Sequence, residues 1–324
     1  MNIPDISFQD YLEAKTEVDE LALNFEVRRR LLSDIGKLAV SNRGPLRVLD
    51  LGTGTGAMVR RLVRDLGAVR SAGTALEICG IDLDSKLIET AGRLCSTDAF
   101  DEVRDDMDSG NVAVEFRVMS VEKALSEANS RELITAHALM DILPMAATCA
   151  AICRSLVPGA LFYATINYNG LTRWYPQAQD AEFEGQLLAY YDRSMRRVRG
   201  DGSEQDGAAS GGRLYEACSA AGLEVLAVGG SDWCVVPQVN FGGGSLRGGS
   251  LRGGNSGAGS TPAYTAAEVR FLGWMLRTMY QEGRKEFASG PMDAWMSDRL
   301  HCLQQAKLAL VVHNLDVLAR RRPN

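Results

Sequence analysis

The sequence predicts an α/β fold built on a doubly wound, mostly parallel sheet of seven strands with an antiparallel edge strand. Two observations predict it. Short apolar runs alternate with segments of helical periodicity between residues 46 and 166, and this alternation is typical of a parallel sheet with helices on both faces. A glycine cluster follows the first apolar run, where a strand passes into a helix. Additional helices are expected at the N-terminus, within the chain and at the C-terminus.

The strands of the parallel part are expected at 47–51, 76–81, 112–118, 133–136 and 160–166. Helical spacing is found over 8–40, 58–66, 85–95, 180–199 and 214–221, and in a segment that ends near Leu156. Two further strands, 223–228 and 233–236, are expected to form a hairpin at the edge of the sheet. From Pro262 to Arg322 the apolar spacing predicts helix. There, His313 and Asp316 are expected to satisfy each other as a buried polar pair, with substrate binding as the alternative.

This pattern predicts four regions: a helical N-terminal cap (1–44), an α/β core (45–236) with a helical insertion at about 168–212, a linker (237–261) and a C-terminal helical region (262–324). Residues 240–260 are rich in glycine and contain a tandem Ser-Leu-Arg-Gly-Gly unit. Because glycine makes ordering entropically costly, a flexible linker is the default interpretation. A glycine-rich ligand loop is the alternative.

Composition restricts the classes of protein that fit. The 324 residues are 46% hydrophobic, which is too high for a disordered chain, and 35 basic against 41 acidic side chains give a net charge of −6. An acidic chain is a poor match for binding nucleic acid through general phosphate attraction. No apolar run approaches the ~20 residues of a membrane helix, and the first residues lack signal-peptide character. We therefore expect a soluble cytoplasmic protein with no nucleic-acid or membrane partner. Its oligomeric state is open, a homodimer being one alternative.

Cysteine and histidine usage predicts no metal site. The seven cysteines are scattered, and the three histidines are far apart in the sequence. Such spacing fits reduced thiols packed as small hydrophobic groups rather than a zinc cluster.

The glycine cluster, residues 52–56, is the strongest local signal, because glycines allow a tight turn and close approach of a ligand to the backbone. Gly52, Gly54 and Ala57 satisfy the spacing of a dinucleotide site. Two features favour another ligand. Asp50 ends the strand, where a carboxylate repels a pyrophosphate but suits a cation, and no basic side chain lies within 52–57 to neutralise phosphate.

The segment Val48-Leu49-Asp50-Leu51-Gly52-Thr53-Gly54-Thr55-Gly56 resembles the first motif of class I S-adenosylmethionine-dependent methyltransferases. The resemblance covers about residues 46–236. It implies that S-adenosyl-L-methionine is the cofactor and that the first motif lines it through Asp50, Gly52, Thr53, Gly54 and Gly56.

Two later segments resemble further cofactor motifs of this family. Gly80-Ile81-Asp82-Leu83 resembles the second motif, which implies that Asp82 accepts from both ribose hydroxyls and that Leu83 packs on adenine. The third motif departs from the family, because Ser120 stands where an acidic residue is common. The Ser120 hydroxyl and the backbone of Val121 are then the implied adenine contacts.

The fourth strand ends at His137, which the resemblance places beneath the sulfonium. Three interpretations stand beside one another: a cofactor contact positioned by the backbone, a general base, and a helix-cap residue with no ligand. No other catalytic candidate is visible. Methyl transfer does not require one, since alignment alone can contribute ~7–11 kcal/mol and a base is needed only for a protonated nucleophile.

The substrate is expected at the carboxyl ends of the strands, where open α/β sheets bind ligands. The segment after the fifth strand offers amides, aromatic rings and a guanidinium as candidates: Asn167, Tyr168, Arg173 and Trp174. A surface turn whose aromatics pack on the added helices is an equal alternative. Together with these candidates, the resemblance implies in-line methyl transfer to a small molecule. An NAD-dependent oxidoreductase and a non-catalytic S-adenosylmethionine-binding protein are the alternatives.

Overall fold

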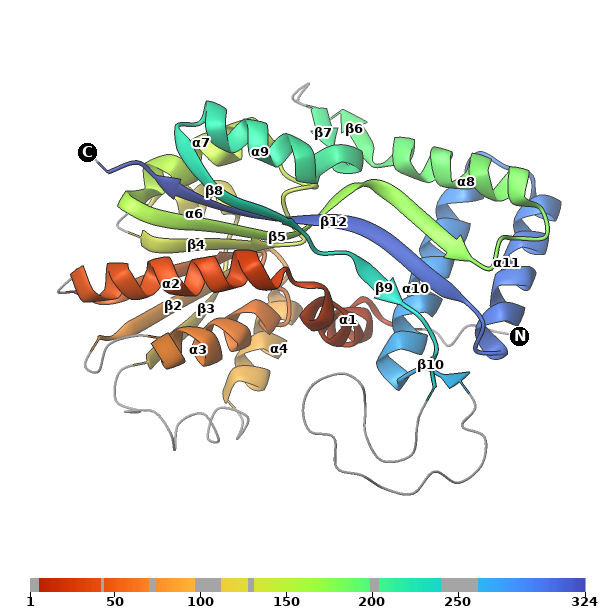
Figure 1. Ribbon diagram of the computed structural model, residues 1–324, viewed down its shortest axis with the longest axis horizontal. Coiled ribbons are helices and arrows are strands. Elements are labelled where there is room, and N and C mark those ends of the chain that lie inside the picture. Colours follow the sequence, from red (N-terminus) through yellow and green to blue (C-terminus); the bar gives the residue numbers. More distant parts are fainter. Residues whose placement is uncertain are drawn as a thin grey trace, which may run out of the picture. The chain divides into compact units, whose positions relative to one another are not determined.

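The computed structural model describes residues 6–41, 44–69, 74–96, 112–127, 131–198, 204–239 and 262–323. The chain divides into two compact units (Figure 1). We call residues 22–170, 195–232 and 313–324 the core unit, and residues 1–21, 171–194 and 233–312 the second unit. The glycine-rich tract 240–260 lies outside the described residues.

Most of the predicted sheet belongs to the core unit, although residues 171–175 of its fifth strand and 309–312 of its last strand are assigned to the second unit. The strands of the sheet are β1 (Leu46–Leu51), β2 (Leu76–Asp82), β3 (Val112–Val118), β4 (Arg131–His137), β5 (Leu156–Tyr175), β8 (Leu223–Gly230) and β12 (Ala309–Arg321). They follow the order β3-β2-β1-β4-β5-β12-β8. β1 pairs in parallel with β2 and with β4, and the pairs β2–β3 and β4–β5 are also parallel. β12 runs antiparallel to β8. The predicted fold class is therefore confirmed.

The far end of this sheet differs from the prediction in its pairing. Among the described residues the sheet has eight strands rather than seven, because β9 (Trp233–Val235) also joins it. The expected hairpin of 223–228 with 233–236 is wrong, since β8 and β9 each pair with β12.

The helix expected to continue to Arg322 is also wrong, because residues 309–321 form β12. The apolar residues of this segment fit a helical stripe. The burial of its side chains, polar ones included, instead follows the period of 2 that a strand has: Leu310, Val312, Asn314 and Asp316 are buried, and the residues between them are less buried. The partner of this strand, β8, lies about ninety residues earlier in the chain, so local spacing could not identify it.

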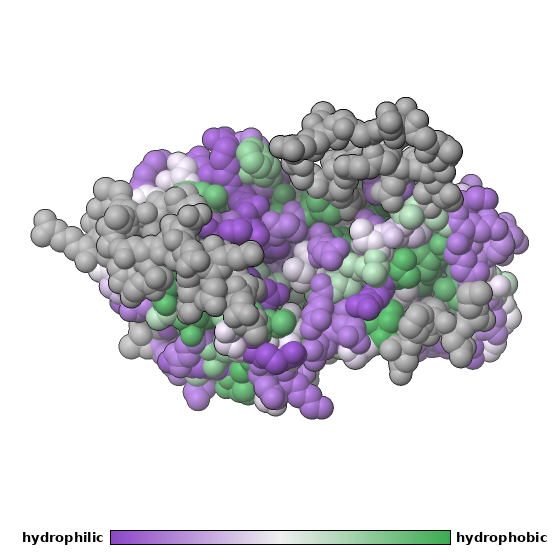
Figure 2. All heavy atoms as spheres, turned by 90° about the horizontal axis from the view of Figure 1, so that it is seen from below, coloured by the Kyte–Doolittle hydropathy of each residue, from purple (hydrophilic) through white to green (hydrophobic). Residues whose placement is uncertain are grey.

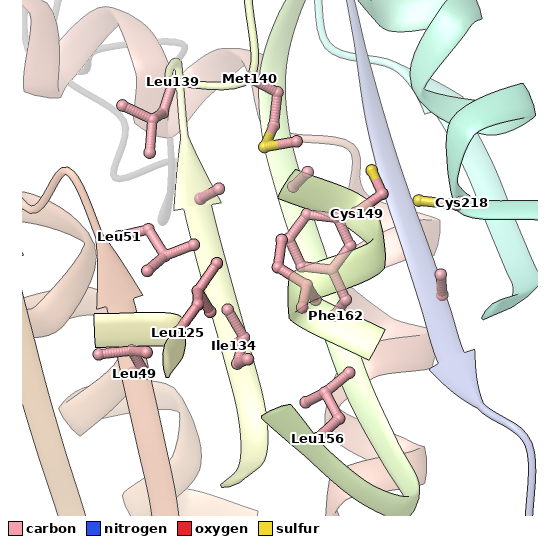
Figure 3. Close-up of a cluster of buried hydrophobic side chains, with 14 of the residues drawn as sticks. Leu49, Leu51, Leu125, Ile134, Leu139, Met140, Cys149, Leu156, Phe162 and Cys218 are labelled. Atoms are coloured by element: carbon pink, nitrogen blue, oxygen red, sulfur yellow. The ribbon is translucent and has the colours of Figure 1, made fainter. Parts of the chain in front are cut away.

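Helices cover both faces of the sheet (Figure 1), and alternating side chains of the strands pack in two separate clusters. On one face, Val48 and its neighbours pack on α2 (Phe25–Ser41) and α3 (Ala57–Val69), with Cys95 of α4 (Ser85–Ser96) beside them. On the other face, Leu49 and its neighbours pack on α6 (Val121–Ser126), α7 (Met145–Ser155) and α9 (Ser210–Ala220) (Figure 3). Each fully buried aliphatic side chain contributes ~1.5–3 kcal/mol to folding. The two clusters therefore fix the sheet that carries the candidate site.

The N-terminal helix is broken in two, whereas the sequence predicted one helix over 8–40. α1 (Phe8–Ala22) ends just before Asn24, and α2 begins after it. The Asn24 Oδ1 accepts the backbone N–H of Val27 at 3.0 Å. This is an N-cap, which asparagine favours strongly, and the asparagine was the sequence signal for the break.

The predicted insertion contains one helix and a short strand pair. α8 (Ala181–Ser194) ends earlier than expected, and β6 (Arg196–Val198) pairs antiparallel with β7 (Glu204–Asp206) before η3 (Gly207–Ala209) leads into α9.

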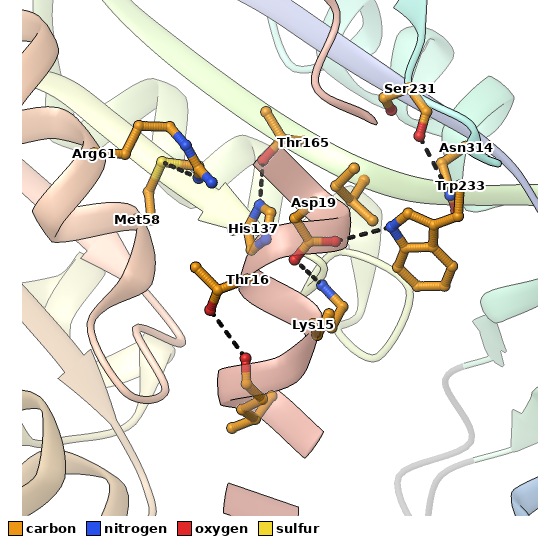
Figure 4. A network of polar contacts seen from close by, with 12 residues as sticks. Lys15, Thr16, Asp19, Met58, Arg61, His137, Thr165, Ser231, Trp233 and Asn314 are labelled. Carbon is orange, nitrogen blue, oxygen red and sulfur yellow. Dashed lines mark hydrogen bonds and ion pairs between the residues drawn. The ribbon is translucent and has the colours of Figure 1, made fainter. Parts of the chain in front are cut away.

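The second unit is mainly helical, with α1, α8, α10 (Ala266–Gly283) and α11 (Ser289–Gln304), and a two-stranded ladder of β10 (Gln238–Val239) and β11 (Pro262–Ala263). Thr265 and Glu268 form a reciprocal capping box at the start of α10. A buried polar group joins α1 to β9: Asp19 accepts from Lys15 at 2.5 Å and from the indole N–H of Trp233 at 2.8 Å (Figure 4).

The surface drawn in Figure 2 is largely hydrophilic, with hydrophobic residues between the polar ones. Among the described helices, none is both long and apolar enough to cross a bilayer.

Candidate functional site

The candidate site lies at the carboxyl edge of the core sheet. β1, β2, β3 and β4 are adjacent and parallel, so their carboxyl ends, at Leu51, Asp82, Val118 and His137, meet at one edge. This is the edge at which open α/β sheets bind ligands. All four ends belong to the core unit.

The glycine cluster forms a tight turn between β1 and α3. Gly52, Gly54 and Gly56 have φ values of 61°, 54° and 80°, in the left-handed region that favours glycine. At Gly52 a Cβ would also lie 2.7 Å from Leu139 Cδ1, so the leucine side chain would have to shift to make room for it. The turn is fixed to β2 by the Thr53 N–H, which donates to the Ile81 carbonyl at 2.8 Å. The sequence therefore needs glycine here for backbone reasons, whatever the ligand.

Asp82 joins the end of β2 to this turn. Its Oδ2 accepts the Gly54 N–H at 3.0 Å, and its Oδ1 accepts the Asp84 N–H at 3.0 Å. Beside it, the side chain of Leu83 is 74% exposed, and that of Val118, which pairs with Asp82 across β2 and β3, is 55% exposed. A carboxylate next to exposed apolar side chains can hold a sugar diol beside a flat aromatic base.

Asp50 is buried at the end of β1. Its Oδ1 accepts from the Thr135 hydroxyl at 2.6 Å, and its Oδ2 has no hydrogen-bond partner among the described residues. Burial raises the pKa of Asp50 to about 6, although the hydroxyls of Thr135 and nearby Thr53 and the charge of Arg61 oppose this shift. A cationic or hydrogen-bond-donating ligand beside the unpaired Oδ2 would stabilise the ionised form. The residues present therefore fit a cofactor that carries an ammonium group.

Ser120 has a structural role at the start of α6. Its hydroxyl oxygen accepts the Lys123 N–H at 3.2 Å and caps α6, whose first residue is Val121. Ser120 and Val121 are both half-buried, and only Met119 separates them from the end of β3. Whether they contact a cofactor stays a prediction.

His137 is held at the end of β4 by Thr165 of β5. The ring Nδ1 lies 2.7 Å from the Thr165 hydroxyl (Figure 4), and the Thr165 carbonyl accepts the N–H of Ala138 at 2.9 Å. Ala138 has a φ of 49°. The helix-cap interpretation of His137 is wrong, because α7 begins only at Met145 and its N-cap is Pro144. The cofactor-contact and general-base interpretations stay open.

The four substrate candidates are divided between the two units. Asn167 and Tyr168 lie in the core unit and are buried. Arg173 and Trp174 lie in the second unit, where Arg173 is exposed and the Trp174 indole nitrogen lies 3.3 Å from Met279 Sδ. The structure therefore places only the first two in the unit that carries the glycine turn.

The predicted pair His313–Asp316 does not form. His313 Nδ1 lies 2.7 Å from Asp232 Oδ1, whereas the Asp316 carboxylate accepts the backbone N–H groups of Asn24 and Ile166, each at 2.9 Å. The physical reason is that residues i and i+3 share a face on a helix but point to opposite faces on a strand.

Sequence reasoning missed the residues that support the site. The Thr135 hydroxyl is hydrogen-bonded to Asp50, and the Thr165 hydroxyl to His137. The side chain of Leu139 lies against Gly52. Each threonine stands inside the apolar run of a buried strand. A polar residue in such a run is the available signal, since it must find a partner.

Comparison with known families agrees with this geometry. A family model for a methyltransferase domain matches residues 24–198, which is more than half of the chain. No curated protein sequence matches the chain significantly.

Several solved structures are similar to this chain at low identity. One is provisionally assigned as a sarcosine dimethylglycine methyltransferase from Galdieria sulphuraria (14% identity, 90% of this chain and 84% of that chain, TM-score 0.42). Another is geranyl diphosphate C-methyltransferase from Streptomyces coelicolor (12%, 90% and 80%, TM-score 0.37). A third is phosphoethanolamine N-methyltransferase 2 from Haemonchus contortus (15%, 87% and 50%, TM-score 0.38).

Because these TM-scores lie below 0.5, none of the three structures bears on the function of this chain. The family match covers the glycine turn, Asp82 and His137 together. The chain therefore belongs to the methyltransferase domain family, and its resemblance to class I S-adenosylmethionine-dependent methyltransferases is confirmed.

Proposed function

We propose that this chain transfers a methyl group from S-adenosylmethionine to a small-molecule acceptor, and that the cofactor binds across the ends of β1, β2 and β4. One observation carries the proposal: the Asp82 carboxylate accepts a hydrogen bond from Gly54 in the glycine turn, and the next residue, Leu83, is exposed. A carboxylate, an open backbone turn and an exposed apolar side chain match a ribose, its neighbouring chain and an adenine.

Each residue has a task in holding the cofactor. Asp82 would accept from the ribose hydroxyls, and Leu83 would cover one face of the base. Gly52 and Gly54 leave the turn without side chains, so that a ligand can reach the backbone. Asp50 would face the amino group, because its Oδ2 is buried without a partner among the described residues.

The main catalytic task of the protein is to align the methyl acceptor with the cofactor. When bound, the cofactor supplies a methyl group on a positively charged sulfur, which is a good leaving group. The protein must hold the acceptor in line and exclude water, and such alignment is worth ~7–11 kcal/mol. His137, oriented by Thr165, would remove a proton only where the acceptor atom is protonated.

A small acceptor is favoured over nucleic acid by charge. The chain carries six more acidic than basic side chains, whereas nucleic-acid binding draws most of its affinity from basic residues that neutralise phosphates.

Titration calorimetry tests the proposal on the purified full chain. S-adenosylhomocysteine should bind, whereas NADH should not. Incubation with methyl-labelled S-adenosylmethionine and a metabolite library should then transfer label to an organic product. Binding of NADH alone would support the oxidoreductase, and binding of S-adenosylhomocysteine without labelled product would support a non-catalytic protein.

A further inference from the structure

The segment that follows Thr165 has a strained backbone and is held by several hydrogen bonds and close contacts. Ile166 has a φ of 55°, a conformation that a β-branched residue rarely adopts. Its N–H donates to Asp316 Oδ1 at 2.9 Å, and both residues are buried. Such strain costs ~1–3 kcal/mol and persists only where surrounding contacts impose it, most often at ligand sites.

The next residue, Asn167, is fixed on both its side chain and its backbone. Its Nδ2 donates to the Leu315 carbonyl at 2.9 Å. A Cβ on Gly211 would lie 2.9 Å from the Asn167 carbonyl oxygen, so α9 approaches this backbone closely. One residue later, the Ser210 hydroxyl donates to the Tyr168 carbonyl at 2.9 Å. Asn167 is therefore held by β12 on one side and by α9 on the other.

One atom of this anchored side chain is unpaired. Asn167 is only 1% exposed, and its Oδ1 has no hydrogen-bond partner among the described residues. The amide orientation follows from chemistry, because the opposite rotamer would set two oxygens, Oδ1 and the Leu315 carbonyl, against each other. A buried acceptor left unpaired costs ~1–3 kcal/mol. A donor from outside the described chain would remove this cost.

We propose that Asn167 Oδ1 accepts a hydrogen bond from an N–H or O–H group of a ligand bound in the methyl-transfer site. This inference rests on the proposed function, which places the ligand at the end of β4. β5 reaches the same edge of the sheet, because Thr165 pairs with His137, and Asn167 lies two residues further along β5. The donor group belongs to the methyl acceptor or to the cofactor, and both offer the same chemistry. Asn167 is thereby a specificity residue that favours ligands with a donor, since buried polar groups reject analogues that leave them unpaired.

Two variants of Asn167 and a matched control separate the sources. Asn167→Leu removes the acceptor oxygen at similar volume, and Asn167→Ala does so without adding apolar bulk. Asn169→Leu is the control, because it makes the same change two residues away at an Oδ1 that is already paired, with the Gly212 N–H at 3.0 Å. Circular dichroism and thermal unfolding identify the variants that fold.

Calorimetry with S-adenosylhomocysteine is the first measurement. A tenfold or greater loss of affinity in an Asn167 variant, with the control near wild type, assigns the donor to the cofactor. If affinity is unchanged, the proteins saturated with S-adenosylhomocysteine are screened by ligand-observed NMR against small amines and alcohols. Each compound is paired with an analogue whose donor hydrogen is replaced by methyl.

The wild-type protein and the Asn169→Leu control should prefer the donor compounds by tenfold or more, and the Asn167 variants should lose this preference. The inference is overturned if cofactor affinity is unchanged and no compound binds the Asn167 variants more weakly, because an ordered water then satisfies Oδ1. Failure of the proposed function is separate: wild type would then bind no S-adenosylhomocysteine.

Discussion

The Asp82 carboxylate accepts the backbone N–H of Gly54 at 3.0 Å and thereby ties the end of β2 to the glycine turn after β1. The same side chain accepts the N–H of Asp84 through its other oxygen. Both oxygens are therefore oriented before any ligand arrives. Pre-oriented groups bind more tightly, because less ordering is left to be done on binding.

Asp82→Asn should lower the affinity for S-adenosylhomocysteine about 10- to 100-fold, because one of two acceptor oxygens and the charge are lost, and a hydrogen bond to a charged group is worth ~1.5–3 kcal/mol. Calorimetry measures the loss. Asp84→Asn is the control, since Asp84 accepts the Lys86 N–H two residues further on and its loss should leave affinity near wild type. Equal losses in both variants would show that Asp82 acts only on the loop.

Gly52→Ala should destabilise the fold by ~2–4 kcal/mol. The new Cβ would lie 2.7 Å from Leu139 Cδ1 and would sit on a residue with a φ of 61°. Gly92→Ala on α4 is the matched substitution, because a Cβ there meets nothing within 4 Å, and helix propensity should stabilise it by up to ~1 kcal/mol. Urea unfolding compares the two. A Gly52 variant as stable as wild type would refute the steric account.

Much of the core could be predicted from sequence because its signals are local. The runs that became β1 to β5 combine apolar residues with β-type spacing, and the glycine turn follows directly on β1. Asp82 could be found in the same way, since it ends a strand. These positions depend on neighbours within a few residues, and periodicity reports such neighbours.

The end of the sheet could not be predicted because its partners are distant. β12 pairs with β8 and β9 from far along the chain, and its apolar spacing fits either a helix or a strand. The role of Asp316 follows from this pairing, because only a strand brings its carboxylate to the N–H groups of Asn24 and Ile166. Tertiary contacts decided the structure here, not propensity.

A basic run in α2 also needed the structure for its interpretation. Arg28 binds Asp65 of α3 through two parallel hydrogen bonds of 2.8 and 2.6 Å, whereas Arg29 pairs with Glu26 on the surface, where both side chains are more than 60% exposed. Arg28→Ala should lower the free energy of unfolding by ~1–2 kcal/mol, because a bidentate, partly buried pair is lost. Arg29→Ala should change it by less than ~0.5 kcal/mol. Chemical denaturation would contradict this ranking if both variants lost the same stability.

The pH dependence of stability should report the buried carboxyl of Asp50. Burial raises its pKa from the ordinary value of 3.8 to about 6, so the folded protein binds this proton more tightly than the unfolded chain does. The free energy of unfolding should therefore fall as pH rises from about 4 to 6 and should level off above pH 6. The change attributable to Asp50 is on the order of 3 kcal/mol, since each pKa unit is worth ~1.4 kcal/mol.

Other carboxyl groups titrate in the same range, so the informative quantity is the difference in unfolding free energy between wild type and Asp50→Asn. The asparagine keeps an oxygen for the Thr135 hydroxyl but does not titrate. This difference should favour the variant increasingly between pH 4 and 6, because ionised Asp50 is penalised only in the folded wild type. Guanidinium unfolding at several pH values measures it. A difference that is constant with pH would show that Asp50 keeps an ordinary pKa and that its Oδ2 is solvated or paired.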